Sequence, residues 1–107
     1  MTTRAECRHA VRMPAAYPAE IRDRRGNRLG CGRTANISEN GVFALIDGHR
    51  PIRPETQVYL FLKLPSIDTV GVRRRRARTV HYLCRVAHIG ALGQLRGVGL
   101  HLISKLC

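Results

Sequence analysis

The chain has 107 residues, of which 44% are hydrophobic, so it can bury one core and is expected to fold as a single domain rather than stay disordered. Its 19 Lys and Arg outnumber 7 Asp and Glu, and the resulting net charge of +12 favours anionic partners such as nucleic acid, a nucleotide or an acidic membrane surface. No apolar run reaches the ~18 residues that span a bilayer and no signal peptide opens the sequence, so we expect a cytoplasmic protein with reduced thiols.

The first residues are basic and poor in apolar side chains, with arginine at positions 4, 8 and 12. This composition predicts a flexible basic arm over residues 1–12, followed by one β-domain over residues 13–107. The four-residue spacing would align the three arginines on one face of a helix, but so short a helix is marginal in water.

Short alternating apolar segments, separated by turns rich in Gly, Pro and Asn, fill the rest of the chain. They predict about six strands and no helix of useful length, which is typical of a small antiparallel barrel or sandwich. The first strand is bracketed by two prolines and is expected at a sheet edge. The long fifth strand needs a bulge near Ala77, because arginines would otherwise face inward. The expected strands are residues 15–21, 28–37, 42–46, 58–64, 70–84 and 97–103, with a loop or an irregular hairpin over 85–95.

A polar turn, Asn36-Ile37-Ser38-Glu39-Asn40-Gly41, separates two of these strands. Asn36 and Ser38 are two residues apart, so in an extended segment they project from the same face. Gly41 leaves the backbone bare, which allows a sharp turn or the close approach of another group. The stretch is therefore either a small polar binding site or an ordinary hairpin turn.

The residues from Arg73 to Arg78 form a second basic feature. A solvated sheet edge is the simpler interpretation, since charges at an edge deter strand-to-strand aggregation. A docking patch for nucleic acid, anionic lipid or an acidic protein is the alternative.

Motifs for catalysis and metal binding are missing from the sequence. There is no nucleophile elbow, phosphate-binding loop or zinc-protease motif, and the acidic residues are not spaced as a catalytic pair. The four cysteines lack CxxC spacing, so a zinc site is not expected. We expect a binding module with no metal and no cofactor, rather than an enzyme.

Three stretches together resemble the PilZ domain, the bacterial receptor module for cyclic di-GMP. Arg8 and Arg12 form an RxxxR motif before the first strand, and Asn36, Ser38 and Gly41 form an [D/N]xSxxG motif after the second. Residues 97–102, Gly-Val-Gly-Leu-His-Leu, resemble the closing strand of that family. The resemblance implies an all-β fold, a six-stranded antiparallel PilZ-type barrel.

The resemblance also implies that Arg8, Arg12, Asn36, Ser38 and Gly41 bind cyclic di-GMP. Arginine forks suit the O6 and N7 acceptors of guanine and the phosphate oxygens. Binding would order the arm, which could then signal to an unidentified partner protein.

The sequence allows more than one register of the arginine motif and more than one function. Arg4 and Arg8 also read as RxxxR, although Arg12 leads more directly into the first strand. Cys7 precedes the preferred motif, at a position that in the family influences whether one or two ligand molecules bind. The alternatives to a receptor are a basic barrel that binds nucleic acid non-specifically and a PilZ adaptor that binds only protein.

Overall fold

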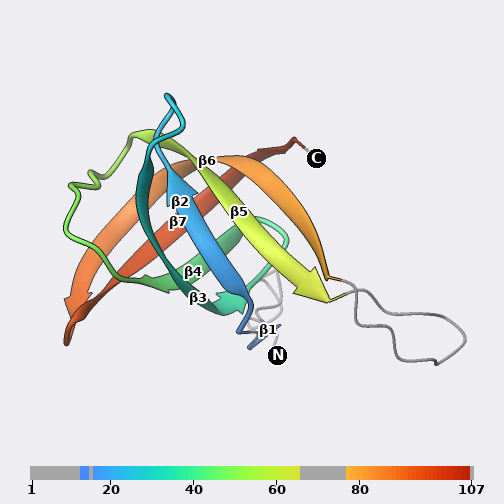
Figure 1. The fold of residues 1–107 in the computed structure, drawn as a ribbon, viewed down its shortest axis with the longest axis horizontal. Helices are drawn as coiled ribbons and strands as arrows, with labels where there is room; N and C mark the ends of the chain where they lie inside the picture. The colour runs from blue at the N-terminus through green and yellow to red at the C-terminus, as the bar shows by residue number, and fades with distance from the viewer. Residues whose placement is uncertain (1–12, 15, 66–76, 107) are drawn as a thin grey trace, which may run out of the picture.

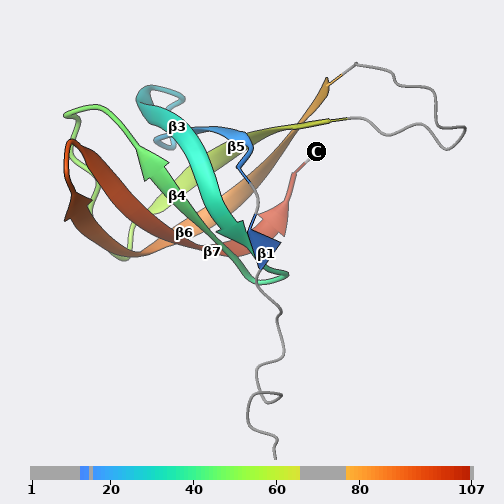
Figure 2. The same ribbon diagram turned by 90° about the horizontal axis from the view of Figure 1, so that it is seen from below.

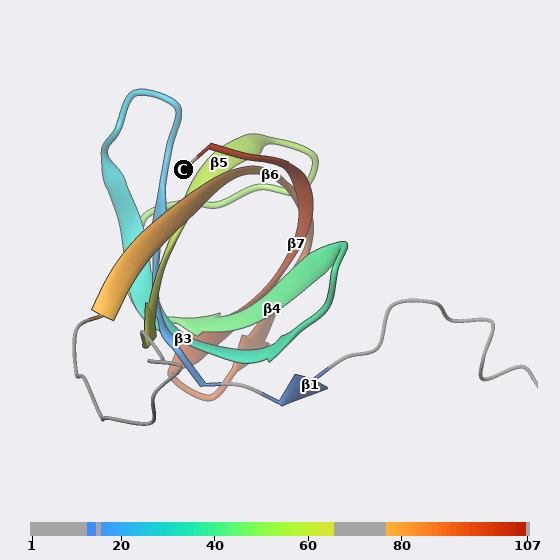
Figure 3. The ribbon, with the colours of Figure 1, turned by 90° about the vertical axis from the view of Figure 1, so that its right-hand side faces the viewer.

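The structure is a computed structural model that describes residues 13–14, 16–65 and 77–106, and it is a closed antiparallel β-barrel. Six strands follow one another in the order β3-β2-β5-β6-β7-β4, and the pairing of β3 with β4 closes the ring (Figures 1 and 3). The described residues contain no helix. The strands are β1 (Met13–Pro14), β2 (Pro18–Arg22), β3 (Arg28–Ile37), β4 (Gly41–Ile46), β5 (Gln57–Pro65), β6 (Ala77–Leu92) and β7 (Leu95–Lys105). The expected six-stranded barrel is confirmed.

Alternation along each strand builds the core. In β5 and β4, every second side chain is buried and its neighbours face outward, as the two-residue period of a strand requires. The inward-facing side chains are small and aliphatic, so they fill a narrow barrel without large aromatic rings. The most deeply buried side chains are Ile21, Ile46, Leu60, Cys84, Val86 and Val98.

The expected edge strand is wrong. β2 pairs with β3 on one side and with β5 on the other, so its backbone is bonded along both flanks. A barrel closed on itself has no free edge, and Pro18 is accommodated because it is the first residue of the strand.

The segment over residues 85–95, expected as a loop or an irregular hairpin, is a hairpin: β6 continues to Leu92, past the expected strand end at residue 84, and a tight turn at Gly93 leads into β7. The register between β6 and β7 shifts between Val86 and His88, which makes Ala87 a bulge. A bulge breaks the two-residue alternation, and this break disguises the strand in the sequence.

The run from Arg73 to Arg78 is mostly outside the described residues, which resume at Ala77. From Ala77 the pairing of β6 with β5 is regular, with Leu64 opposite Arg78, so the bulge expected near Ala77 is not found within the described part of the strand. Arg78 is exposed. The basic arm over residues 1–12 also lies outside the described residues.

Candidate functional site

The polar turn forms the hairpin between β3 and β4. Its backbone closes through a 2.9 Å hydrogen bond that the amide of Ser38 donates to the carbonyl of Gly41. The amide of Gly41 donates in return to Oγ of Ser38 at 3.2 Å. The hairpin-turn interpretation is therefore confirmed, and Ser38 stabilises the turn whether or not it also contacts a ligand.

A bulge in β3 decides which way the motif faces. Thr34 lies opposite Ala44 and Asn36 lies opposite Phe43, so Ala35 is an extra residue between them. Thr34 is buried at 3% exposure, and without the bulge Asn36 would also point inward. With it, Ile37 packs against the core and Asn36 takes the outer face.

Gly41 lies against β7 as that strand passes. A Cβ atom at this position would come within 2.8 Å of the carbonyl oxygen of Leu100. The missing side chain is thus required by the barrel itself, because a neighbouring backbone cannot easily yield. Next to it the exposed His101 is its Cα partner on β7, so an imidazole borders the turn.

The chain enters the barrel beside this turn. In the pairing of β1 with β3, Met13 lies opposite Ile37 and Pro14 opposite Asn36 (Figure 2). Asn36 and Ile37 thus lie between β1 on one side and β4 on the other. Arg8 and Arg12 precede Met13 and lie outside the described residues, so the structure brings together three of the five expected site residues.

The segment between β1 and β2 is anchored to β3. The amide of Tyr17 donates to Oγ1 of Thr34 at 2.9 Å, and the amide of Thr34 donates to the carbonyl of Tyr17 at 2.9 Å. Because Thr34 is buried and Tyr17 is half-buried, this reciprocal pair is partly shielded from water and holds the incoming chain in register.

Phe43 faces outward beside Asn36, and His88 faces outward across β7 from Phe43; the sequence analysis singled out neither residue. Their rings stack with centroids 6.1 Å apart. The alternation of β4 would have placed Phe43 on the outer face, opposite the strand's buried residues. His88 could not have been placed, because its direction depends on the bulge at Ala87.

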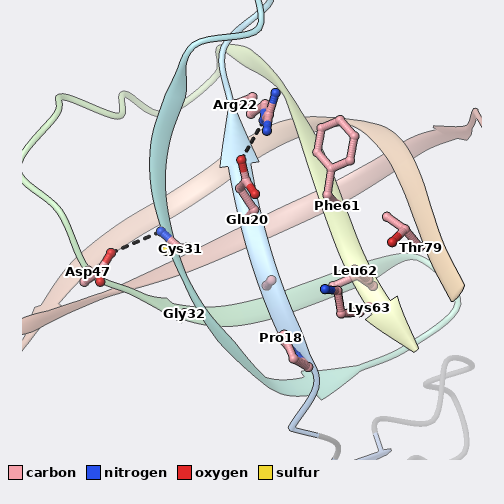
Figure 4. A pocket seen from close by; sticks show the side chains of 11 residues that line it. Pro18, Glu20, Arg22, Cys31, Gly32, Asp47, Phe61, Leu62, Lys63 and Thr79 are labelled. Atoms are coloured by element: carbon pink, nitrogen blue, oxygen red, sulfur yellow. Dashed lines mark hydrogen bonds and ion pairs between the residues drawn. The ribbon is translucent and has the colours of Figure 1, made fainter. Parts of the chain in front are cut away.

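A hollow lies on the outer face of the barrel over β2, β3 and β5 (Figure 4). It is an open groove of about 510 Å³ whose wall mixes both signs of charge, including Glu20, Arg22, Asp47 and Lys63. Partial burial raises the pKa of Glu20, but ion pairs with Arg22 at 2.6 Å and Arg28 at 3.4 Å outweigh that effect and lower the pKa overall. Glu20 is thus paired with arginine, and Asp47 accepts a hydrogen bond from the amide of Cys31 at 3.1 Å, so the groove presents mixed charge rather than a concentrated charge of one sign.

Chemistry that would indicate catalysis is not visible in the described part of the chain. No group of three His, Cys, Asp or Glu side chains there is placed to hold a metal ion. Burial raises the pKa of the Cys84 thiol to about 12, which leaves it protonated and unreactive. None of the described residues forms a helix long and apolar enough to cross a membrane.

Comparisons with known proteins agree with the fold. The family model for the PilZ domain matches residues 6–105. The structure resembles that of the Bacillus subtilis inhibitor of motility, MotI/DgrA, with a TM-score of 0.70 at 18% sequence identity. The likeness covers 94% of this chain and 44% of the MotI/DgrA chain, so this chain spans less than half the length of that protein. A comparison with curated proteins finds no match.

Proposed function

Because the chain belongs to the PilZ domain family, we propose that it is a receptor that binds cyclic di-GMP and passes the signal to a partner protein by contact. The observation that carries the proposal is the pairing of β1 with β3. Arg12 is bonded to Met13, and Met13 lies opposite Ile37, inside the [D/N]xSxxG motif. The sequence that ends the first motif therefore leads directly into the strand that pairs with the second motif, which begins 24 positions after Arg12, at Asn36.

The chemistry of these residues suits the ligand. A guanidinium presents a planar fork of donors that can meet O6 and N7 of guanine or two oxygens of a phosphate. The amide of Asn36 offers both a donor and an acceptor, and the bulge at Ala35 points it to the outer face. Arg8 and Arg12 would bind from the arm while Asn36 and Ser38 bind from the barrel.

Gly41 contributes to the site through its missing side chain. It lets the hairpin lie against β7 and leaves no side chain between the turn and an approaching base. Binding would order the arm at a cost in conformational entropy, which charge-assisted hydrogen bonds offset. An arm that is ordered only with ligand bound presents a new surface, and this is how we propose that the protein signals within the bacterial cytoplasm.

Titration calorimetry with cyclic di-GMP tests the proposal, with cyclic di-AMP as the matched control. Both ligands carry two phosphates, but adenine replaces the O6 acceptor of guanine with an amine donor. We expect saturable binding of cyclic di-GMP and at least tenfold weaker binding of cyclic di-AMP, roughly the value of one bidentate base contact. No binding of cyclic di-GMP at on the order of tens of micromolar would reject the receptor function. Equal binding of both ligands would reduce the site to one for phosphate.

The net charge of +12 keeps non-specific nucleic-acid binding as the second candidate. Its signature is binding that weakens steeply with salt, shows no preference for cyclic di-GMP, and survives the loss of Arg8 and Arg12.

A further inference from the structure

Two rings cover the bare backbone of β7 on the outer face of the barrel. β7 lies between β4 and β6, and its outward positions at Gly97 and Gly99 carry no side chain. A Cβ at Gly99 would meet the His88 ring, with Nε2 at 2.6 Å and Nδ1 at 2.8 Å. A Cβ at Gly97 would come within 2.6 Å of Cζ of Phe43. Each ring therefore occupies space that a glycine leaves vacant.

The two rings stack on one another with roughly parallel planes. Their centroids are 6.1 Å apart and their planes differ by 25°. With β7 beneath them, the two rings form an aromatic surface over Gly97 and Gly99, which we call the Phe43–His88 platform. His88 is exposed and Phe43 is half-buried, so the outer side of the platform is open to water.

Two separate bulges bring the polar and aromatic groups to this face. Thr34 and Val86 are buried, and two residues further on Asn36 and His88 would also point inward in regular strands. The extra residues Ala35 and Ala87 reverse both directions. Bulges of this kind re-aim side chains next to binding sites. Asn36 is also the Cα partner of Phe43, so its amide lies at the border of the platform.

Packing of the core does not account for the platform. An exposed imidazole adds little to the core, and the glycines beneath the rings remove side chains that would otherwise cover β7. An open aromatic surface bordered by an amide has the two elements that recognise a nucleobase, a face to stack on and an edge to hydrogen-bond.

The barrel carries a second Phe–His pair that serves as a contrast. Phe61 and His81 stack with centroids 4.7 Å apart, and the guanidinium of Arg22 lies 5.2 Å from the Phe61 centroid. The faces of Phe61 are therefore occupied by its own neighbours. Among the described residues, no arginine is found over the Phe43–His88 platform in the same way.

We propose that the Phe43–His88 platform is the stacking surface for one purine of the cyclic dinucleotide, whose edge then meets Asn36. This inference rests on the proposed function, since it assigns a base subsite to the same ligand. It adds two residues to the site that belong to neither family motif, and it gives Gly97 and Gly99 the role of leaving room for the two rings.

The test is calorimetric titration of cyclic di-GMP into the wild type, His88→Ala and Phe43→Leu, with His81→Ala as the matched control. His81 and His88 are both on β6 and both stack on a phenylalanine, but only His88 belongs to the platform. Leucine at position 43 keeps most of the apolar volume and removes the π face. A melting curve for each variant establishes that it is folded.

We expect His88→Ala and Phe43→Leu each to weaken binding by roughly five- to a hundredfold, the range for one base stacked on an aromatic side chain. His81→Ala should change it by less than about twofold, as for other substitutions away from a site. NMR gives an independent readout, because a purine above His88 shifts its ring protons upfield. If the wild type binds but neither platform variant weakens binding, or His81→Ala weakens it equally, this inference is overturned. If the wild type does not bind, the receptor function itself fails.

Discussion

Met13 lies opposite Ile37 in the pairing of β1 with β3, one residue from Ser38 at the start of the β3–β4 turn. Arg12 immediately precedes Met13 in the sequence, so the basic segment is joined to the barrel next to the polar turn. The β1 pairing thus links the sequence before the barrel to the face that carries Asn36 and the Phe43–His88 platform.

The anchor at Thr34 is expected to contribute measurably to stability. Thr34→Val keeps the shape of the side chain and removes the acceptor for the partly buried amide of Tyr17. An unsatisfied buried donor costs about 1–3 kcal/mol, so the free energy of unfolding should fall by that amount. Thr79→Val is the control, since Thr79 is exposed on β6. Equal urea midpoints for the two variants would contradict the role of the anchor.

Two glycines in extended strands should respond in opposite ways to alanine. A Cβ at Gly32 would collide with the carbonyl group of Leu45 on β4, whereas a Cβ at Gly90 would meet no atom within 4 Å. Gly32→Ala should therefore destabilise the barrel by at least about 2 kcal/mol, because strand backbone has to shift. Gly90→Ala should be neutral or stabilising by up to about 1 kcal/mol. Thermal unfolding of both variants is the measurement, and a similar loss in both would be inconsistent with the close approach of β3 to β4.

Alkaline pH should weaken the fold through Cys84. Burial raises the pKa of this thiol from 9.0 to about 12, so the folded state keeps a proton that the unfolded state releases. Stability is therefore unaffected below about pH 9 and falls as the pH rises from about 9 towards 12, by up to about 1.4 kcal/mol per unit. Cys84→Ala removes this term, although it also loses some packing. Urea unfolding at pH 8 and pH 10 should show a larger drop for the wild type than for the variant, and parallel drops would refute the assignment.

The regular parts of the fold were predictable from the sequence because their side chains alternate. The strand expected at residues 28–37 has the bounds of β3, and the strand at 58–64 is one residue shorter than β5 at each end. The wrong predictions, the end of the fifth expected strand and the edge position of the first, share a cause: bulges and barrel closure do not appear in the alternation of side chains. The bulge at Ala87 disguised the second half of β6, and closure of the barrel turned an expected edge strand into an interior one.

The candidate site was likewise predictable only in part. Asn36, Ser38 and Gly41 were found because they are close in sequence and form one motif, and the structure gives Ser38 and Gly41 an additional role in the turn. Phe43 and His88 were missed because they come from strands far apart in the chain. Their meeting over β7 depends on its glycines and on the register of three strands, which no single segment specifies.

The measurement that tests the central claim most directly is the affinity for cyclic di-GMP of the double variant Arg8→Lys/Arg12→Lys. Lysine keeps the net charge of +12 and therefore the long-range attraction, but it loses the planar fork. The control is Arg25→Lys/Arg28→Lys, in and after the turn between β2 and β3, where both side chains are exposed. If the two motifs form one site, the arm variant should bind at least roughly tenfold more weakly than the wild type while the control binds normally. Unchanged affinity of the arm variant, or an equal loss in both, would contradict the account.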